Sequence, residues 1–417
     1  MGVLRERFAA LGAAIPEILL PREGIDLQKW ALIACDQYTQ DRSFWENAER
    51  LVGDAPSTLR FIFPEAYLED RRQERINSIQ RAMASALEND LVPHTGCVYV
   101  ERDTPYNRNR RGLILALDLE CYRWEDDSRT LIRPTEGTVP ERITARMETR
   151  RGAPLETPHI LVLIDDRENK LLPALGERAR QRDPCYDSPL LFNAGRVRGW
   201  LLDREDDLEF LAGGLETLAA HSPFLYAMGD GNHSLAAAGA VWNEYKRARA
   251  DEDGIENHPA RWALVEVENL HDPALSFQPI HRVLFNTSLD EVYEALRALP
   301  GFRSRPSPDD APVSYRLVSR GRERVVETDA GGLAVEPLQN ALDDFLKSHP
   351  AATIDYIHGA EEVARIAAVG AVGILLPPFP RENLFQTVAG GPLPRKSFSL
   401  GESSEKRFYL ECRRINL

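Results

Sequence analysis

Short apolar runs and segments with a helical pattern alternate along this chain of 417 residues. The run Val372–Leu376, which two prolines stop, has the continuous apolar character of a buried strand, whereas Glu65–Leu91 and Ala360–Ala368 have helical patterns. Such alternation is typical of α/β and α+β folds. Because 43% of the residues are hydrophobic, the chain can bury an extensive core, and its length predicts two or three domains.

Proline- and glycine-rich joints and changes of periodicity suggest three regions along the chain. We expect an N-terminal α/β region at residues 1–125, a core at 126–287 and a C-terminal α/β region at 288–417. The third region contains predicted helices at 290–299 and 338–347, and its final residues, Arg407–Arg413, have the pattern of a strand.

Charge and cysteine content exclude several classes of protein. A net charge of -14 without a long basic run argues against a nucleic-acid partner. The five cysteines lie far apart and form no Cys-x-x-Cys pair, so we expect neither a disulfide framework nor a thiolate zinc site, and we assign no metal ligands. No segment reaches the roughly 18 uncharged apolar residues of a membrane span, and no signal sequence is visible. These features predict a cytoplasmic protein with no membrane partner.

The stretch Tyr226–Ala238 changes character in its middle and is the first candidate site. An apolar run ends at Gly229-Asp230-Gly231, the polar residues Asn232, His233 and Ser234 follow, and an alanine-rich segment begins. This order predicts a strand, a turn and a helix, with the polar cluster at the helix N-terminus, where unpaired backbone N–H groups favour anions. The alternative is that Asn232 or Ser234 serves only as the N-cap.

A second candidate segment is Arg133–Arg142, in which Thr138 and Glu141 have the spacing of a capping box. The predicted helix extends to about Gly152 and carries Arg142, Arg146 and Arg150 along one face. These cations could hold an anionic substrate while Glu136 acts as a base; the commoner use of such a stripe is a solvated face balanced by glutamates.

Three further segments contain polar residues that could belong to the site. The loop Gly390–Phe398 contains Arg395 and Lys396 and could close over phosphoryl oxygens, although it could equally be an exposed loop. His281 lies in otherwise apolar surroundings and could be a satisfied core residue. Asp36 follows an apolar run and could face a site from the first region.

Five ordered motifs together resemble the family catalogued as domain of unknown function 1015. They are Thr135-Glu-Gly-Thr138, Met228-Gly-Asp-Gly-Asn-His-Ser234, Pro279-Ile-His-Arg282, Asp355-Tyr-Ile-His358 and Pro394-Arg-Lys-Ser397. The similarity spans nearly the whole chain. In that family the turn usually has the sequence Asp-Gly-His-His-Arg and the upstream motif His-Glu-x-Thr, and both are similar to motifs of the free serine kinases.

The resemblance implies an α+β fold, mixed α/β, with a ParB/sulfiredoxin-like nucleotide-binding core elaborated by the N- and C-terminal regions. It implies that Glu136 is the catalytic base, that Asp230 and His233 act with it, and that the turn of Gly231, Asn232 and Ser234 binds the nucleotide phosphates. We also expect the C-terminal region to close over the site, because a polyphosphate on a protein of net charge -14 needs local cations and Gly390 and Gly391 would let the loop close.

This sequence departs from the family pattern where a phosphate ligand is expected. Either Pro134 or Thr135 stands at the position of the upstream histidine, Asn232 replaces the first histidine of the turn, and Ser234 replaces its arginine. Guanidinium is the preferred bidentate phosphate ligand, so a kinase needs a substitute cation. The candidates are Arg142, Arg146, Arg282 and Lys396, and we expect Lys396 to approach the turn.

The leading hypothesis is therefore a phosphotransferase that moves phosphate between ADP or ATP and the hydroxyl of a small amino acid such as L-serine, with Mg²⁺ on the nucleotide. The substrate side is assigned to Asp36, Arg133, Thr138, His281, Arg282 and Tyr356. A nucleotide-binding regulator and a phosphate-ester hydrolase with the same pocket are the alternatives. A homodimer is one expected assembly.

Overall fold

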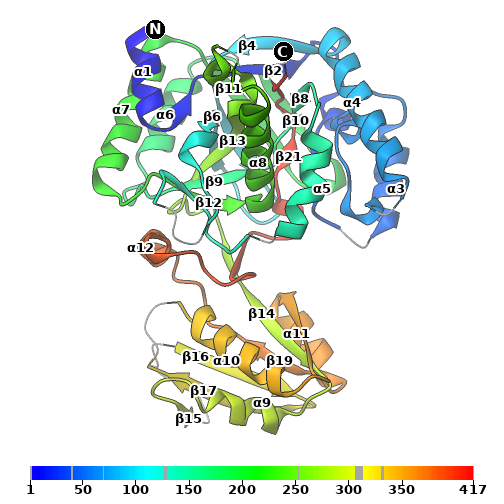
Figure 1. The fold of residues 1–417 in the computed structure, drawn as a ribbon, viewed down its shortest axis with the longest axis vertical. Coiled ribbons are helices and arrows are strands. Elements are labelled where there is room, and N and C mark those ends of the chain that lie inside the picture. The colour runs from blue at the N-terminus through cyan, green and yellow to red at the C-terminus, as the bar shows by residue number, and fades with distance from the viewer. Residues whose placement is uncertain are drawn as a thin grey trace. The chain divides into compact units, whose positions relative to one another are not determined.

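The computed structural model describes residues 2–38, 41–68, 70–125, 129–138, 140–251, 253–305, 313–329 and 333–416, without the side chains at positions 141, 142 and 305. It divides the chain into two compact units (Figure 1). Unit 1 comprises residues 1–275 and 402–417, and unit 2 comprises residues 276–401. These units have other bounds than the three regions expected from the sequence: residues on both sides of position 125 share unit 1 and its sheet, and the final segment of the chain returns to the same unit.

A mixed sheet forms the centre of unit 1. In spatial order its strands are β10 (Tyr186–Pro189), β11 (Arg196–Leu202), β5 (Cys97–Asp103), β6 (Arg110–Asp118), β13 (Trp262–Asn269), β9 (Leu161–Ile164), β12 (Tyr226–Asp230) and β7 (Ile132–Arg133), with β1 (Ala13–Ala14) paired to β6. The β13–β9 and β12–β7 pairs are parallel, and the other pairs are antiparallel. This arrangement and the helices around it confirm the expected mixed α/β class; the ParB/sulfiredoxin-like label stays a prediction.

Both faces of this sheet are buried. Successive residues of a strand point to opposite faces, and accordingly Cys97 and Tyr99 belong to one core cluster while Val98 and Val100 belong to the other. The first face is covered by α1 (Gly2–Ala10), α6 (Leu171–Ala179), α7 (Glu205–His221) and α8 (Asn232–Ala248). In Figure 1, α8 crosses in front of the central strands.

The second face is covered by elements from both ends of the chain. The N-terminal part supplies β2 (Glu17–Pro21), α2 (Leu27–Trp30), β3 (Leu32–Ile33), α3 (Arg42–Val52), α4 (Arg72–Asn89) and β4 (Leu91–Thr95). The C-terminal part supplies β21 (Phe408–Tyr409), paired with β3, and β22 (Arg413–Arg414), paired with β8 (Leu155–Glu156). The segment Arg407–Arg413, predicted as a single strand, therefore forms two short strands because it pairs with two different partners.

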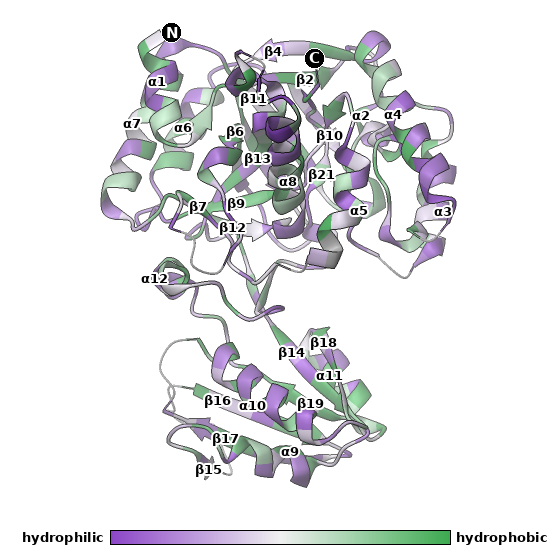
Figure 2. Ribbon diagram, in the orientation of Figure 1, coloured by the Kyte–Doolittle hydropathy of each residue, from purple (hydrophilic) through white to green (hydrophobic). Residues whose placement is uncertain are grey.

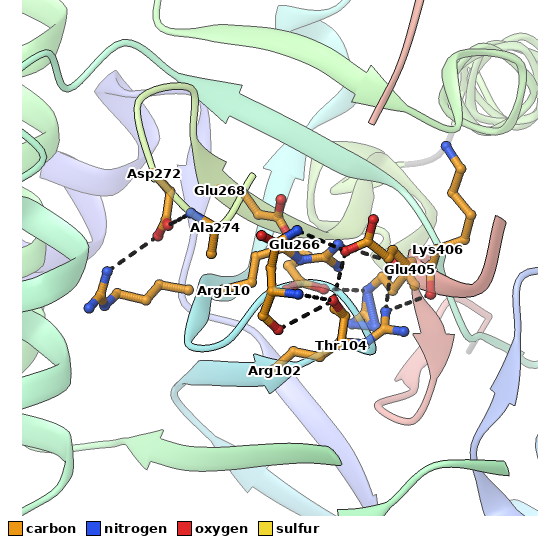
Figure 3. A network of polar contacts seen from close by, with 12 residues as sticks. Arg102, Thr104, Arg110, Glu266, Glu268, Asp272, Ala274, Glu405 and Lys406 are labelled. Carbon is orange, nitrogen blue, oxygen red and sulfur yellow. Dashed lines mark hydrogen bonds and ion pairs between the residues drawn. The ribbon is translucent and has the colours of Figure 1, made fainter. Parts of the chain in front are cut away.

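A network of buried charges holds this C-terminal segment on the sheet (Figure 3). Arg102 donates from Nη1 to the backbone oxygens of Glu405 (2.9 Å) and Lys406 (2.6 Å), and Arg110 donates to the Glu405 oxygen (2.9 Å). The Arg110 Nε also lies 3.0 Å from the carboxylate of Glu268. A hydrogen bond to a charged group typically contributes about 1.5–3 kcal/mol, so the three arginine bonds to backbone oxygens fix where residues 405 and 406 lie.

Unit 2 is built on an antiparallel sheet of its own. In order the strands are β15 (Arg303–Arg305), β17 (Arg322–Thr328), β16 (Val313–Ser319), β19 (Val372–Leu375), β14 (Phe277–Phe285) and β18 (Thr353–His358), with β20 (Phe398–Leu400) on the first part of β14. Its helices are α9 (Leu289–Leu296), α10 (Val335–Ser348), α11 (Ala360–Ala368) and α12 (Leu384–Gly390). Hydrophilic and hydrophobic residues alternate along α9 and α10 in Figure 2, as expected of helices with one face on a core.

Across the described ranges, no helix is long and apolar enough to cross a membrane.

Candidate active site

The junction at Tyr226–Ala238 has the predicted strand–turn–helix structure. The strand β12 ends at Asp230, Gly231 adopts a left-handed conformation with φ 74° and ψ 25°, and α8 begins at Asn232. The pairing of β12 with β9 shifts register between Met228 and Asp230, so Gly229 lies in an irregularity of the strand. The two glycines thus have separate uses: one accommodates the irregular strand, and the other makes the turn.

Gly231 is also required by its close packing. A Cβ atom at this position would lie 3.1 Å from the Cα of Ile160. The N–H of Gly231 donates to Oδ1 of Asp230 at 2.8 Å. Gly231 occupies the N-cap position itself, and no described side chain caps α8, so the expectation that Asn232 or Ser234 is the N-cap is wrong.

Asn232 connects the turn to the upstream motif. Its Nδ2 donates to the backbone oxygen of Glu136 and to Oγ1 of Thr138, both at 3.0 Å. One step earlier, the Thr135 hydroxyl donates to the Met228 oxygen at 2.7 Å, and β7 and β12 run parallel side by side. Residues 135–138 and 228–232 therefore form one structural element, although they lie almost a hundred residues apart in sequence. The Asn232 amide therefore bridges both loops.

Lys406 supplies a cation at the turn that sequence reasoning missed. Its Nζ lies 2.9 Å from Oδ2 of Asp230, and only 10% of the Lys406 side chain and 26% of the Asp230 side chain are exposed. In Figure 3 the Lys406 side chain extends away from the buried charges that hold its backbone. The only signal in the sequence is a group of charged residues just before the apolar Phe408–Leu410, which does not identify a partner.

Three polar side chains, those of Ser234, Asp36 and Tyr409, lie around the imidazole ring of His159. Its Nε2 lies 3.3 Å from the Ser234 hydroxyl and 3.3 Å from Oδ2 of Asp36, and its Nδ1 lies 2.8 Å from the Tyr409 hydroxyl. The Tyr409 hydroxyl also lies 3.1 Å from the sulfur of Cys35. The predicted Asp36 and Ser234 are thus brought together, whereas His159, Tyr409 and Cys35 were not predicted.

The charges of this cluster are strongly perturbed. Burial by itself would raise the pKa of the Asp36 carboxyl, but the charge and hydrogen bond of His159, together with Arg146, hold that pKa well below its ordinary value. Burial, followed by the Asp36 charge, raises the pKa of the Cys35 thiol to about 11. Asp36 is therefore a carboxylate, and Cys35 is a neutral thiol of low reactivity.

The His159 cluster differs from a serine nucleophile triad. In such a triad the carboxylate and the serine hydroxyl bind opposite nitrogens of the imidazole. Here Asp36 and Ser234 both approach Nε2, while Nδ1 contacts Tyr409. With Asp36 accepting the proton of Nε2, this nitrogen cannot remove a proton from Ser234.

A pocket opens beside the His159 cluster in unit 1. Its empty space, including solvent at the mouth, is about 940 Å³. His159, Ser234, Cys35 and Tyr409 form part of its lining. Arg146 also lines it and forms an ion pair with Glu65 at 2.6 Å, as Arg150 does with Glu156 at 2.6 Å. The expected solvated arginine face on α5 (Pro140–Arg150) is therefore partly a paired, pocket-lining face; the Arg142 side chain lies outside the described residues.

The other predicted substrate residues have partners elsewhere. The Arg133 guanidinium lies 4.7 Å from the centre of the Phe224 ring and donates to the Thr130 oxygen at 3.2 Å. In unit 2, Arg282 is fully buried and contacts Gln339, the Lys396 oxygen (2.9 Å) and the Tyr356 ring (5.1 Å).

His281 also has a partner inside unit 2, where Nδ1 accepts from the Leu376 N–H at 3.1 Å. Burial lowers the pKa of His281 to about 4, with smaller contributions from the charges of His358 and Arg282. The functional roles assigned to His281, Arg282, Tyr356 and Lys396 stay predictions.

Among the residues that the structure describes, no group of three or more His, Cys, Asp and Glu side chains is suited to hold a metal ion.

Comparisons with known proteins place the chain in a family. No functionally curated protein matches the sequence. Among solved structures, a free serine kinase in complex with AMP is similar with 13% identity, a TM-score of 0.38 and coverage of 72% of this chain and 92% of the other. The C-terminally truncated SbnI from Staphylococcus aureus has 11% identity, a TM-score of 0.38 and coverage of 69% and 82%.

A conserved hypothetical protein from Pyrococcus furiosus has 11% identity, a TM-score of 0.36 and coverage of 71% and 93%. Similarity at this level does not establish a shared activity. The model of the family described as "Protein of unknown function (DUF1015)" matches residues 19–345, which is well over half of the chain. The chain therefore belongs to the DUF1015 family.

Proposed function

We propose that this protein transfers a phosphoryl group between a nucleotide and the hydroxyl of a small molecule at the turn of residues 230–234. The observation that carries the proposal is the position of Asn232, which ties the Glu136 segment to the N-terminus of α8 through two hydrogen bonds of 3.0 Å. A carboxylate-bearing loop and the positive end of a helix are thereby adjacent. Phosphoryl transfer needs both a base near the acceptor and positive groups around the phosphate.

Lys406 supports the proposal because it supplies a positive charge at the turn in which Ser234 stands where the family pattern has arginine. An ammonium group 2.9 Å from Asp230 lies next to the turn where a phosphate would meet the backbone. Its small exposed fraction reduces screening by water, which makes the charge more effective than that of a surface lysine. Asp230 in this proposal is a positioning residue, since it holds both Lys406 and the Gly231 N–H.

The proposed step conserves all atoms. The acceptor oxygen forms a bond to the terminal phosphorus of the nucleotide, the hydroxyl proton passes to Glu136, and the bond between that phosphorus and the bridging oxygen breaks. The shortened nucleotide leaves with the electron pair of the broken bond. Mg²⁺, when bound to the nucleotide, neutralises part of the phosphate charge. His233, in the first turn of α8, is proposed to contact the phosphate.

L-serine, with ATP or ADP, is the acceptor to test first, because the upstream motif resembles that of the free serine kinases. The test incubates the protein with Mg²⁺, either nucleotide and L-serine, and measures phosphoserine by mass spectrometry. A phosphorylated product that Glu136→Gln abolishes, and that Glu168→Gln at an exposed position of the same unit leaves unchanged, supports the proposal.

A rise in melting temperature with nucleotide, but no product with any hydroxyl acceptor, would replace this proposal with a nucleotide-binding regulator. Release of inorganic phosphate alone would favour a hydrolase.

A further inference from the structure

The residues that line the pocket beside the turn indicate which kind of acceptor molecule the pocket could bind. Most of its wall is apolar and comes from three parts of unit 1, namely the segment before α4, helix α5 and the residues that lead into β9. Phe61, Phe63, Leu68, Ala145, Leu155 and Ile160 are among these lining residues. A mostly apolar wall with a few polar groups at one end is characteristic of small-molecule sites.

The polar groups of the pocket are concentrated where it meets the turn. Ser234 and His159 lie 3.3 Å apart there, and Tyr409 contacts the opposite nitrogen of the imidazole at 2.8 Å. His159 is only 7% exposed, so these groups can discriminate hydrogen-bonding partners strongly. The arginines of the wall are each paired with a glutamate, Arg146 with Glu65 and Arg150 with Glu156, which balances their charge.

The turn and the pocket share structural elements. Ser234 belongs to the first turn of α8 and also lines the pocket. Gly231 of the turn also packs against Ile160 and His159, since an added Cβ would lie 3.1 Å from the first and 3.5 Å from the second. A molecule in the pocket with a hydroxyl at Ser234 therefore has that hydroxyl beside the proposed phosphate turn.

We infer that this pocket binds the acceptor of the proposed transfer. The acceptor is a small uncharged alcohol whose apolar aliphatic or aromatic part fills the pocket while its hydroxyl meets Ser234. The inference rests on the proposed function for the acceptor role, and it changes the substrate class from L-serine to an apolar alcohol. His159 is a positioning residue here: Asp36 and Tyr409 fix its ring, and its Nε2 holds the Ser234 hydroxyl that meets the acceptor.

The test uses a homologous series of probes, 1-butanol, 1-pentanol and 1-hexanol, with L-serine for comparison. Binding to the whole protein is measured by ligand-observed NMR with and without nucleotide, and transfer is measured by mass spectrometry. Burial of each added methylene is expected to increase affinity about fourfold. The affinity for L-serine is expected to be below that of every alcohol in the series.

Two substitutions test the location. Ala145→Phe fills the pocket from α5 and is expected to weaken 1-hexanol binding at least tenfold, whereas Thr144→Phe, at the exposed neighbouring position of the same helix, leaves it unchanged. Leu68→Trp fills the pocket from another wall and replaces Ala145→Phe if that variant does not fold. His159→Gln distinguishes a positioning role of His159 from a role in packing alone. If His159 positions the hydroxyl, the substitution should lower the transfer rate more than it lowers the affinity for the alcohol.

The outcomes distinguish this inference from the proposed function. Alcohol binding that the filling variants abolish, together with alkyl phosphate formation, supports both. Phosphorylation of L-serine without alcohol binding, or alcohol binding that neither filling variant affects, overturns the inference and leaves the proposed function standing. Alcohol binding in the pocket without transfer to any acceptor overturns the proposed function and the acceptor role, and upholds only the pocket as an alcohol site.

Discussion

Replacement of Lys406 by methionine tests the cation on which the account depends. Methionine keeps much of the apolar stem of lysine and removes the ammonium group that lies 2.9 Å from Asp230. We expect two separate effects, a loss of folding stability because Asp230 loses this partner and a loss of nucleotide affinity because the phosphate loses its cation.

The magnitudes follow from the burial of the pair. With 10% and 26% of the two side chains exposed, the pair lies between a surface ion pair, worth about 0–1 kcal/mol, and a fully buried one, whose disruption costs about 3–5 kcal/mol. We expect a destabilisation of about 1–3 kcal/mol. A hydrogen bond to a charged group contributes about 1.5–3 kcal/mol, which corresponds to about a 10- to 150-fold loss of nucleotide affinity.

Isothermal titration with a non-hydrolysable nucleotide measures the affinity, and urea unfolding measures the stability. Lys246→Met is the matched control, because Lys246 also pairs with a carboxylate of unit 1, that of Glu120, but lies in the last turn of α8. The affinity loss in Lys406→Met should shrink in high salt, as expected for an electrostatic contact.

The double variant Lys406→Met/Asp230→Asn separates the two effects. The side-chain amide oxygen introduced by the second substitution can still accept the Gly231 N–H, and no unpaired carboxylate is left at the turn, so folding stability should recover while nucleotide affinity stays low. Wild-type affinity in the single variant would refute the reasoning. Recovery of affinity in the double variant would show that Lys406 serves only to hold Asp230.

Three further predictions concern other parts of unit 1. Glu136→Gln should lower the rate of phosphoryl transfer about 100-fold or more with an unchanged melting temperature, measured by initial rates; a wild-type rate would remove Glu136 as the base. Asp36→Asn should cost about 1–3 kcal/mol of stability at pH 7, because the folded-state pKa of Asp36 is lowered. The difference from wild type should begin to shrink as the pH falls below about 4, the ordinary pKa of the unfolded carboxyl, and should disappear only as the pH falls through the lowered folded-state pKa; a pH-independent difference in urea unfolding would contradict this. Deletion of residues 402–417 should unfold unit 1, because it removes five buried side chains, those of Phe408, Tyr409, Leu410, Cys412 and Ile415. Burial of each such side chain contributes about 1.5–3 kcal/mol, and the total stability of a protein is typically about 5–15 kcal/mol. A native circular-dichroism spectrum of the truncated chain would refute this.

The sequence predicts local structure well where glycine and hydrophobic pattern determine it. The strand–turn–helix at Tyr226–Ala238 follows from Gly229, Gly231 and the alanine-rich segment, and the structure confirms it. The helix predicted at Ala360–Ala368 has the same bounds as α11. Such features depend on neighbours in the chain, so composition and periodicity are sufficient to find them.

The parts of the site that depend on long-range contacts could not be predicted in the same way. Lys406 is 176 residues from Asp230, and Tyr409 is 250 residues from His159. Their positions follow from the return of the C-terminal segment to unit 1, which Arg102 and Arg110 fix through buried hydrogen bonds to backbone oxygens. Arginine contacts to backbone oxygens leave no periodic pattern in the sequence, so the family motif suggested substitute cations in other segments.

Determination of the structure with a bound non-hydrolysable nucleotide is the measurement that tests the central claim most directly. The account predicts that the terminal phosphate lies at the N-terminus of α8, within hydrogen-bond distance of the backbone at Asn232 or His233 and of the Lys406 ammonium group, with the segment of Glu136 beside it. A nucleotide bound away from residues 230–234, with Lys406 contacting only Asp230, would contradict it.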